Sequence, residues 1–401
     1  MATNILLFCF AIFSAFLVIY CQNHERTLAP KFSVNLDLPP EDRWTHVVEV
    51  YKSHIPIIRK SLAKYIPPEL MPLVDFIADQ FHLFLPDVFT REIKGIAKAA
   101  GMPAGDVFLL NCLYEITSFC TSIVAQDSHG HIIHGRNLDY GNDPEETEIF
   151  KNATIEIDYQ RNGKTIYSAT TILGYTGVVN GQRPGAFTVS FDEREKHAGA
   201  AGAVENFFMA FLDGGVPDLM LMREVLENAT SYKEAVQQIT TRKLIADGYY
   251  IVGGVQPGEG AVITRDRTRA ADVWNLDADN SRWFLVETNY DHWLPTPQHD
   301  DRRFQANKVM KGIGQAKINN DTMMEALSTL DVLNGNTVVT SIMSAADPSM
   351  YRSWVRYDST GLKKSGYRHD TALKFQPLSH KVKDWKRLYS PERFSRKKGR
   401  K

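Results

Sequence analysis

The spacing of apolar residues changes at Cys120, about a third of the way along this chain of 401 residues. Residues 24–119 show mostly helical spacing, whereas the stretch from Cys120 alternates with period two. Groups of strands and helices then follow in turn, an order typical of an α+β protein. The sequence therefore predicts two antiparallel sheets sandwiched between helical layers, an αββα arrangement preceded by a helical segment.

The expected elements are short and separated by turn residues such as Asn162-Gly163, the dipeptide favoured in a type I′ turn. Strands are expected at 121–125, 131–136, 153–159, 165–171, 186–191, 249–252, 261–264, 272–275, 283–288, 338–343 and 351–357. Helices are expected at 70–85, 90–100, 203–212, 218–227, 231–240, 303–311 and 321–329. Gly101 is expected to end the second of these helices.

The N-terminus carries an apolar stretch, Ile5–Tyr20, with no Lys or Arg before Arg26. This stretch is short for a membrane span, so we interpret residues 1–22 as a signal peptide, with a short signal anchor as the alternative. Three N-x-[ST] sequons also indicate secretory routing and predict glycosylation. Their asparagines are Asn152, Asn228 and Asn320.

Only two of the four cysteines, Cys112 and Cys120, lie clearly beyond this segment. A disulfide framework is therefore not expected to stabilise the chain. A bridge between the two is conceivable, but a thiol that performs chemistry must stay free. For Cys112 we favour a buried apolar role, whereas for Cys120 that role ranks second.

The net charge of −1 conceals an asymmetry, because the segment from Lys381 onward carries a net +8 and the rest −9. A basic tail can contact anionic lipid or nucleic acid. We favour a solvated, disordered extension over 361–401, and secretory routing conflicts with nucleic-acid binding.

The expected helix over 70–85 is apolar almost all round, which indicates burial or contact with lipid. Packing in the core is favoured. The alternative is a surface that borders the path of a lipid substrate, formed by Phe76, Ile77, Phe81 and Leu85.

A cysteine nucleophile needs activation, because the ordinary pKa of its thiol is about 8.5. Cleavage of the Phe119–Cys120 bond would place a new α-amine within the same residue, as base and as positive charge. Arg136 and Asp139 are candidate partners along the following strand. Their spacing of three puts them on opposite faces unless the strand bends, and a surface ion pair is the alternative interpretation.

The sequence offers little support for metal or nucleotide chemistry. His129, His131 and His134 are interpreted as surface residues of a hairpin, because no carboxylate or thiol completes a zinc site. The chain has no Gly-x-Ser-x-Gly, His-Glu-x-x-His or P-loop motif, and Gly253-Gly254 follows a strand without a dinucleotide fingerprint. We expect neither a metal nor a cofactor.

Six segments together resemble the acid ceramidase family, in the same order and between residues 30 and 358. They are Cys120–Asp127, Gly135–Tyr140, Asp192–Arg194, Tyr249–Gly254, Thr288–Trp293 and Asp300–Arg303. The resemblance implies an αββα fold of the N-terminal-nucleophile hydrolase type. It also implies a lysosomal precursor, with secretion as a further destination, that cuts itself before Cys120 into an α-chain (23–119) and a catalytic β-chain (120–360).

The resemblance also implies roles for individual residues. Cys120 would be the nucleophile, and its freed amine, held by Asp139, would shuttle protons. Arg136 would support the thiolate and the tetrahedral intermediate. At acid pH the thiol and amine would then titrate as a coupled pair.

Three further residues take roles by the same resemblance. Asn289 would donate to the oxyanion, with Arg302 nearby, and Glu193 would assist self-cleavage. Acidification could trigger that cleavage by changing the charge on Glu193 or Asp139.

The implied substrates are fatty-acid amides taken from a membrane surface or carrier. Ala246–Tyr250 and His292 favour the branch that hydrolyses fatty-acid ethanolamides to fatty acid and ethanolamine. Ceramide hydrolysis is the nearest alternative, followed by a bile-salt or penicillin-type acylase. A lipid-binding protein without turnover is the alternative from another class, although binding alone would not require this set of residues.

Overall fold

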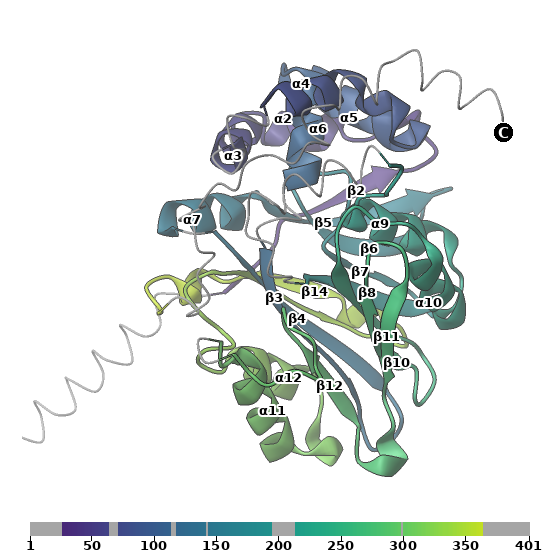
Figure 1. Ribbon diagram of the computed structural model, residues 1–401, viewed down its shortest axis with the longest axis vertical. Coiled ribbons are helices and arrows are strands. Elements are labelled where there is room, and N and C mark those ends of the chain that lie inside the picture. The colour runs from purple at the N-terminus through teal and green to yellow at the C-terminus, as the bar shows by residue number, and fades with distance from the viewer. Residues whose placement is uncertain are drawn as a thin grey trace, which may run out of the picture.

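The computed structural model describes residues 26–63, 71–113, 118–141, 143–194, 213–297 and 300–363. Two sheets lie face to face between layers of helices, as Figure 1 shows. This αββα sandwich confirms the predicted fold class. The signal peptide, the helix expected at 203–212 and residues 364–401 of the basic extension fall outside the described residues, as does the side chain of Cys112.

One sheet has six strands within the described residues, in the order β1-β14-β13-β4-β3-β12, and every pair is antiparallel. In that order they span Thr27–Leu28, Arg352–Val355, Thr337–Met343, Ile132–Tyr140, Ser118–Gln126 and Phe284–Glu287. The long hairpin of β3 and β4 lies in this sheet, so the stretch around Cys120 belongs to an interior strand.

The other sheet has eight strands within the described residues, in the order β11-β10-β9-β8-β7-β6-β5-β2. They span Ala270–Asn275, Gly260–Arg265, Gly248–Gly253, Phe187–Glu193, Asn180–Arg183, Lys164–Ile172, Thr154–Arg161 and Lys31–Asn35. The pair of β2 and β5 is parallel, so the expectation of two wholly antiparallel sheets is wrong at this edge.

Helices cover the outer faces of both sheets (Figure 1). Helices α11 and α12 pack on the six-stranded sheet, and α9 and α10 pack on the eight-stranded sheet. The N-terminal helices α2 to α6 gather beside β2 and β5, and α7 follows β4. The helices span Thr45–Val50, His54–Ala63, Met71–Gln80, Asp87–Ala100, Ala104–Leu113, Pro144–Ala153, Asp218–Asn228, Tyr232–Thr241, Arg302–Ile313 and Asn320–Leu327, from α2 to α7 and then α9 to α12.

Local sequence signals explain several boundaries. Gly101 ends α5 with φ 69°, the left-handed conformation that glycine adopts without a steric penalty. Asn162 and Gly163 both have positive φ between β5 and β6, as a type I′ turn requires. Asn319 and Thr322 form a capping box at the start of α12.

The N-terminal segment is the main departure from the sequence-based expectation. The segment 24–119, expected to be helical, contains β1 and β2, and each adds an edge strand to one of the sheets. Strands of two and five residues are too short to show a period against their surroundings. The helix expected over 70–85 ends at Gln80 and continues as a 3₁₀ turn, Phe81–Leu83.

Candidate active site

Strand β3 runs through the Phe119–Cys120 bond without a register shift against β4. Cys120 lies opposite Leu138, so its side chain and that of Arg136 point to the same face, toward the eight-stranded sheet. Phe119 and Asp139 point to the other face, where α11 and α12 lie. The strand stays regular, and Arg136 and Asp139 lie on opposite sides of it, as their spacing predicts.

The thiol of Cys120 is fully buried and faces a guanidinium. Nη2 of Arg136 donates to Sγ at 2.9 Å and to the main-chain oxygen of Phe191 at 2.6 Å. Nε of the same side chain lies 3.4 Å from Oδ1 of Asp192. A single buried cation therefore touches both the sulfur and a carboxylate.

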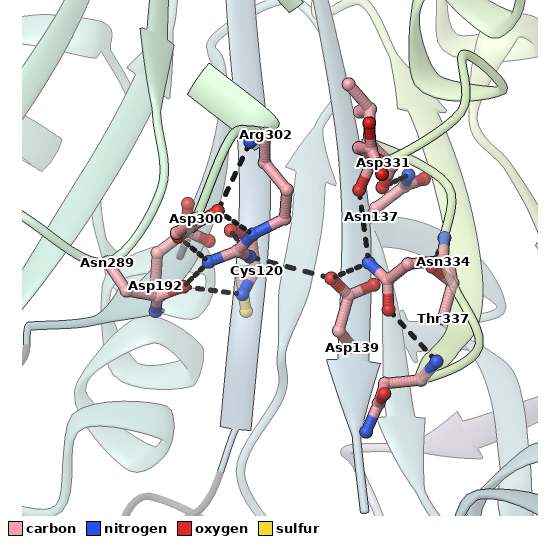
Figure 2. A network of polar contacts seen from close by, with 12 residues as sticks. Cys120, Asn137, Asp139, Asp192, Asn289, Asp300, Arg302, Asp331, Asn334 and Thr337 are labelled. Atoms are coloured by element: carbon pink, nitrogen blue, oxygen red, sulfur yellow. Dashed lines mark hydrogen bonds and ion pairs between the residues drawn. The ribbon is translucent and has the colours of Figure 1, made fainter. Parts of the chain in front are cut away.

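A second set of groups holds the backbone of Cys120 (Figure 2). Its amide nitrogen donates to Oδ1 of Asn289 at 3.1 Å, and its carbonyl oxygen accepts from Nη1 of Arg302 at 2.8 Å. Nη2 of Arg302 also donates to Oδ1 of Asn289 at 2.9 Å. The nitrogen that would become the α-amine after cleavage is thus held by Asn289, and Arg302 holds the carbonyl of the same residue.

Carboxylates surround Arg302 on this outer face. Asp300 accepts from it at 2.9 and 2.6 Å, and Oδ2 of Asp139 lies 3.5 Å from its Nη1. Asn334 donates to the same Oδ2 at 2.8 Å. Asp139 therefore lies within reach of the Cys120 backbone through Arg302, and its carboxylate is aimed away from the sulfur.

Burial dominates the electrostatics of these groups. It raises the pKa of the Cys120 thiol well above its ordinary value; Arg136 acts in the opposite direction, whereas Asp192 and Asp139 raise this pKa further. Burial also raises the pKa of Asp139, against the effect of Arg302. In this uncleaved chain the thiol is therefore neutral, and the cation nearest to it is Arg136.

Glu193 ends strand β8 and is only partly buried. Its main-chain oxygen accepts from Nδ2 of Asn289 at 2.8 Å. The structure thus brings Cys120, Arg136, Asn289 and Arg302 together, and it places Asp139 and the backbone of Glu193 at the edge of the same cluster. In the uncleaved chain one N–H of Nδ2 of Asn289 is donated to Glu193, and its second N–H is the donor that a role at the oxyanion would use.

Two buried carboxylates beside the thiol have no role in the sequence analysis. Asp192 lies in one of the six segments that carry the family resemblance, but nothing in the sequence shows that β8 faces β3. Glu287 lies on β12 opposite Ser122, and its Oε2 has no hydrogen-bond partner among the described residues. A glutamate next to Phe284–Val286 in an apolar strand is the signal that could have revealed it.

The four residues proposed to border the substrate path lie in the N-terminal layer. Ile77, Phe81 and Leu85 are buried in the largest core cluster, and Phe76 packs against it partly covered. Phe81 stacks on Phe108 with ring centroids 5.2 Å apart. Core packing, the favoured alternative, describes these side chains in this structure, and the role in substrate access stays a prediction.

The three hairpin histidines behave differently from one another. His129 and His131 are exposed, and His131 pairs with Asp127 at 3.0 Å. His134 is fully buried between Thr188 and Ser190, so the interpretation of all three as surface residues is wrong for it. Among the described residues no group of three or more His, Cys, Asp or Glu side chains is arranged to hold a metal ion.

The sequon asparagines differ in exposure. Asn152 and Asn228 are exposed, whereas Asn320 is partly buried at the start of α12. Glycosylation at these positions stays a prediction. Across the part of the chain that the structure describes, every helix is too short or too polar to span a bilayer.

A buried cysteine on an interior strand of an αββα sandwich, facing an arginine, defines the class of N-terminal-nucleophile hydrolases. A family model described as linear amide C–N hydrolases, choloylglycine hydrolase family, matches residues 120–321. A second, described as the beta subunit of N-acylethanolamine-hydrolyzing acid amidase, matches residues 27–85. The chain belongs to this family of amide hydrolases.

Known proteins agree with this assignment. N-acylethanolamine-hydrolyzing acid amidase of Mus musculus is 42% identical over 334 residues, which cover 82% of this chain and 90% of the mouse protein. Acid ceramidase of Homo sapiens is 38% identical over 336 residues, covering 79% and 84%. The solved structure of a Caenorhabditis elegans N-acylethanolamine-hydrolyzing acid amidase ortholog has a TM-score of 0.54 at 41% identity, covering 59% of this chain and 99% of that one. The resemblance to the acid ceramidase family is confirmed.

Proposed function

We propose that this chain is a precursor that cuts itself between Phe119 and Cys120, and that the product hydrolyses fatty-acid ethanolamides. The observation that carries the proposal is the environment of Cys120. Its sulfur meets Arg136 at 2.9 Å, and its amide and carbonyl are held by Asn289 and Arg302. A merely structural cysteine in an apolar core would not need a buried guanidinium at its sulfur.

The boundary between the two family models supports self-cleavage at this bond. One model ends at residue 85, and the other begins at residue 120. In the proposed cleavage the thiol of Cys120 attacks the carbonyl carbon of Phe119. The C–N bond breaks, a thioester forms, and the nitrogen takes up a proton as the new α-amine. Water then hydrolyses the thioester, which leaves a carboxylate on Phe119 and a free thiol.

Turnover would use the same atoms again. The α-amine takes the thiol proton, the sulfur attacks the amide carbonyl of the substrate, and the amine passes its proton to the departing nitrogen. Water hydrolyses the resulting acyl thioester and releases the fatty acid. Arg136 stabilises the sulfur anion, and the second N–H of Nδ2 of Asn289 stabilises the developing oxyanion.

The two chains would remain associated after cleavage. Strand β1 pairs with β14, and β2 pairs with β5, so the N-terminal segment supplies an edge to both sheets. The N-terminal helices also share the largest core cluster with the sandwich, for example through Ile93 and Tyr159. Separation would expose this apolar surface to water, which costs about 25 cal/mol per Å². The family description names the matching N-terminal region a beta subunit, in contrast to the α-chain label used above.

Ethanolamides are the proposed substrates because the N-acylethanolamine-hydrolyzing acid amidase of Mus musculus is 42% identical. Ceramide is the second candidate, since acid ceramidase relatives reach 39%. Lysosomal targeting, an acidic working pH and contact with a lipid surface accord with this substrate class. They are part of the proposal, as is glycosylation.

The test begins with the purified precursor, held at about pH 4.5 and about pH 7.5. We expect a fragment whose N-terminus is Cys120 by mass and sequencing, and no such fragment from Cys120→Ala. Release of fatty acid from a C16 ethanolamide and a C16 ceramide then ranks the two substrates. An intact chain under every condition would refute self-cleavage, and preferential ceramide turnover would replace the ethanolamide assignment.

A further inference from the structure

Asp192 is a fully buried carboxylate on β8 that faces the β3–β4 hairpin across the sandwich. Its Oδ1 accepts from Ser122 at 2.9 Å and lies 3.4 Å from Nε of Arg136. The same guanidinium donates to the sulfur of Cys120 at 2.9 Å. Two groups that can each become anionic therefore share one cation.

This sharing restricts which charge states are accessible. If Asp192 and Cys120 were both anionic, the buried cluster would hold two negative charges against the single positive charge of Arg136. An uncompensated charge in a water-free interior costs several kcal/mol. If Asp192 is neutral, the thiolate is the only negative charge in this cluster, and Arg136 compensates it. Ionisation of the carboxyl thus opposes ionisation of the sulfur.

We propose that Asp192 is a positioning residue that couples acidification to the nucleophile. As a carboxylate it takes the charge of Arg136 away from the sulfur. As a neutral acid it leaves that charge to the thiolate that forms during attack, while the thiol proton moves to the departing nitrogen. The proposal rests on the proposed function of Cys120, and it assigns the acid requirement to a side chain outside the cleaved bond.

The other titratable groups on the inner face of β3 have pKa values outside the range between about pH 4 and pH 7. Burial raises the pKa of Asp192 to about 6, while Arg136 and Ser122 act in the opposite direction. Burial raises the pKa of Glu287 on β12 to about 8, so it is neutral below that pH. Burial lowers the pKa of His134 on β4 to about 3, so it is neutral above that pH.

Two further groups next to Asp192 also stay protonated. Tyr249 lies beside Asp192 on β9, and burial raises its pKa. Asp192 itself raises the pKa of the Cys120 thiol. Among these groups on the inner face of β3, Asp192 is therefore the one whose charge changes between about pH 4 and pH 7.

The experiment measures self-cleavage of the full-length precursor between pH 4.5 and 8, by mass spectrometry, for the native chain and Asp192→Asn. In the native chain we expect cleavage at pH 7.5 to be more than about tenfold slower than at pH 5, since each pH unit above the pKa reduces the neutral fraction about tenfold. In Asp192→Asn the residue is neutral at every pH, so the ratio of the two rates should fall below about three.

The matched control is Asp158→Asn, the same substitution at a partly buried aspartate on β5 that pairs with Lys31. It should keep the native ratio of rates. A folded Asp192→Asn protein that retains the native ratio, or that fails to cleave at every pH, would overturn the proposal.

If Asp192→Asn does not fold, Asp192→Glu is the second variant. It keeps a carboxyl group but moves it by one methylene, so the pH midpoint of cleavage should shift. An unchanged midpoint would also overturn the proposal. Absence of cleavage in the native chain would instead refute the proposed function, which keeps the two failures distinct.

Discussion

Two arginine–aspartate clusters flank Cys120, one on each face of strand β3. On the inner face Arg136 reaches the sulfur at 2.9 Å and Asp192 at 3.4 Å. On the outer face Arg302 reaches the Cys120 carbonyl at 2.8 Å and the Asp300 carboxylate at 2.9 and 2.6 Å.

The difference lies in how completely each cation is already paired. Burial disfavours the charged form of Arg302, but Asp300 and Asp139 outweigh this effect and raise its pKa. Its charge is compensated whatever the state of the sulfur, so it acts on position. Arg136 donates directly to the sulfur at 2.9 Å, so we expect it to act on charge. One pair of side-chain types therefore serves geometry on one face and reactivity on the other.

Substitution of Arg136 should have the largest effect. Arg136→Met removes the cation beside the sulfur and leaves Asp192 buried without a counter-charge. Loss of one electrostatic stabiliser in an active site typically costs about 10²–10³ in kcat. Steady-state turnover of a fatty-acid ethanolamide measures it, with circular dichroism to confirm folding. Turnover within about threefold of native would contradict the charge role of Arg136.

Arg302→Lys should have a smaller effect and a different signature. Lysine retains the charge but cannot contact Cys120, Asn289 and Asp300 with a planar fork. We expect kcat to fall about tenfold, with the pH midpoint of activity unchanged because the inner cluster is intact. The full pH profile distinguishes the two faces: a shifted midpoint would show that the outer cluster also sets charge.

Ser122→Ala should shift the pH at which cleavage is activated. Ser122 donates to Asp192, and this hydrogen bond lowers the pKa of the carboxyl. Without it the pKa should rise, so activation on acidification should begin at a higher pH, by about one unit or less. The midpoint of the cleavage-rate profile measures the shift. A midpoint that moves to lower pH would show that the bond stabilises the neutral acid instead.

Glu287 provides the smallest predicted effect, on stability. Its folded-state pKa is raised to about 8, above the value of about 4.3 in an unfolded chain. The folded state then binds the proton more tightly, so this contribution to the free energy of unfolding is lost as pH rises from about 4.3 to about 8. Glu287→Gln mimics the neutral acid and should match the native melting temperature at pH 5 but exceed it at pH 8 by a few degrees. If the melting temperatures of Glu287→Gln and the native chain differ by the same amount at both pH values, titration of Glu287 is excluded as the cause.

The sequence predicted the fold class and several residues of the candidate site. Period-two alternation gave the β3–β4 hairpin, and the spacing of Arg136 and Asp139 placed them on opposite faces. Alternation is local, because every strand residue points to the side opposite its neighbour. Asn289 and Arg302 were assigned to the site only through the family resemblance, because nothing in the sequence around either residue shows that it reaches Cys120.

The edge strands and the two extra carboxylates could not be obtained in this way. Strands β1 and β2 are too short for a periodic signal and gain their hydrogen bonds from β14 and β5, far along the chain. Likewise, Asp192 and Glu287 are ordinary strand residues until a second sheet or a neighbouring strand comes to lie beside Cys120.

The sequence alone determined which side chains share a face of the hairpin, and through its motifs the amide hydrolase family. Tertiary structure alone decided that Asp192 shares Arg136 with the sulfur and that Arg302 holds the Cys120 backbone. The physical reason is that the direction of a side chain follows from its own strand. Which charged groups lie next to that side chain depends on the strand packed against it. The packing of segments that are distant in the sequence determines which strand this is.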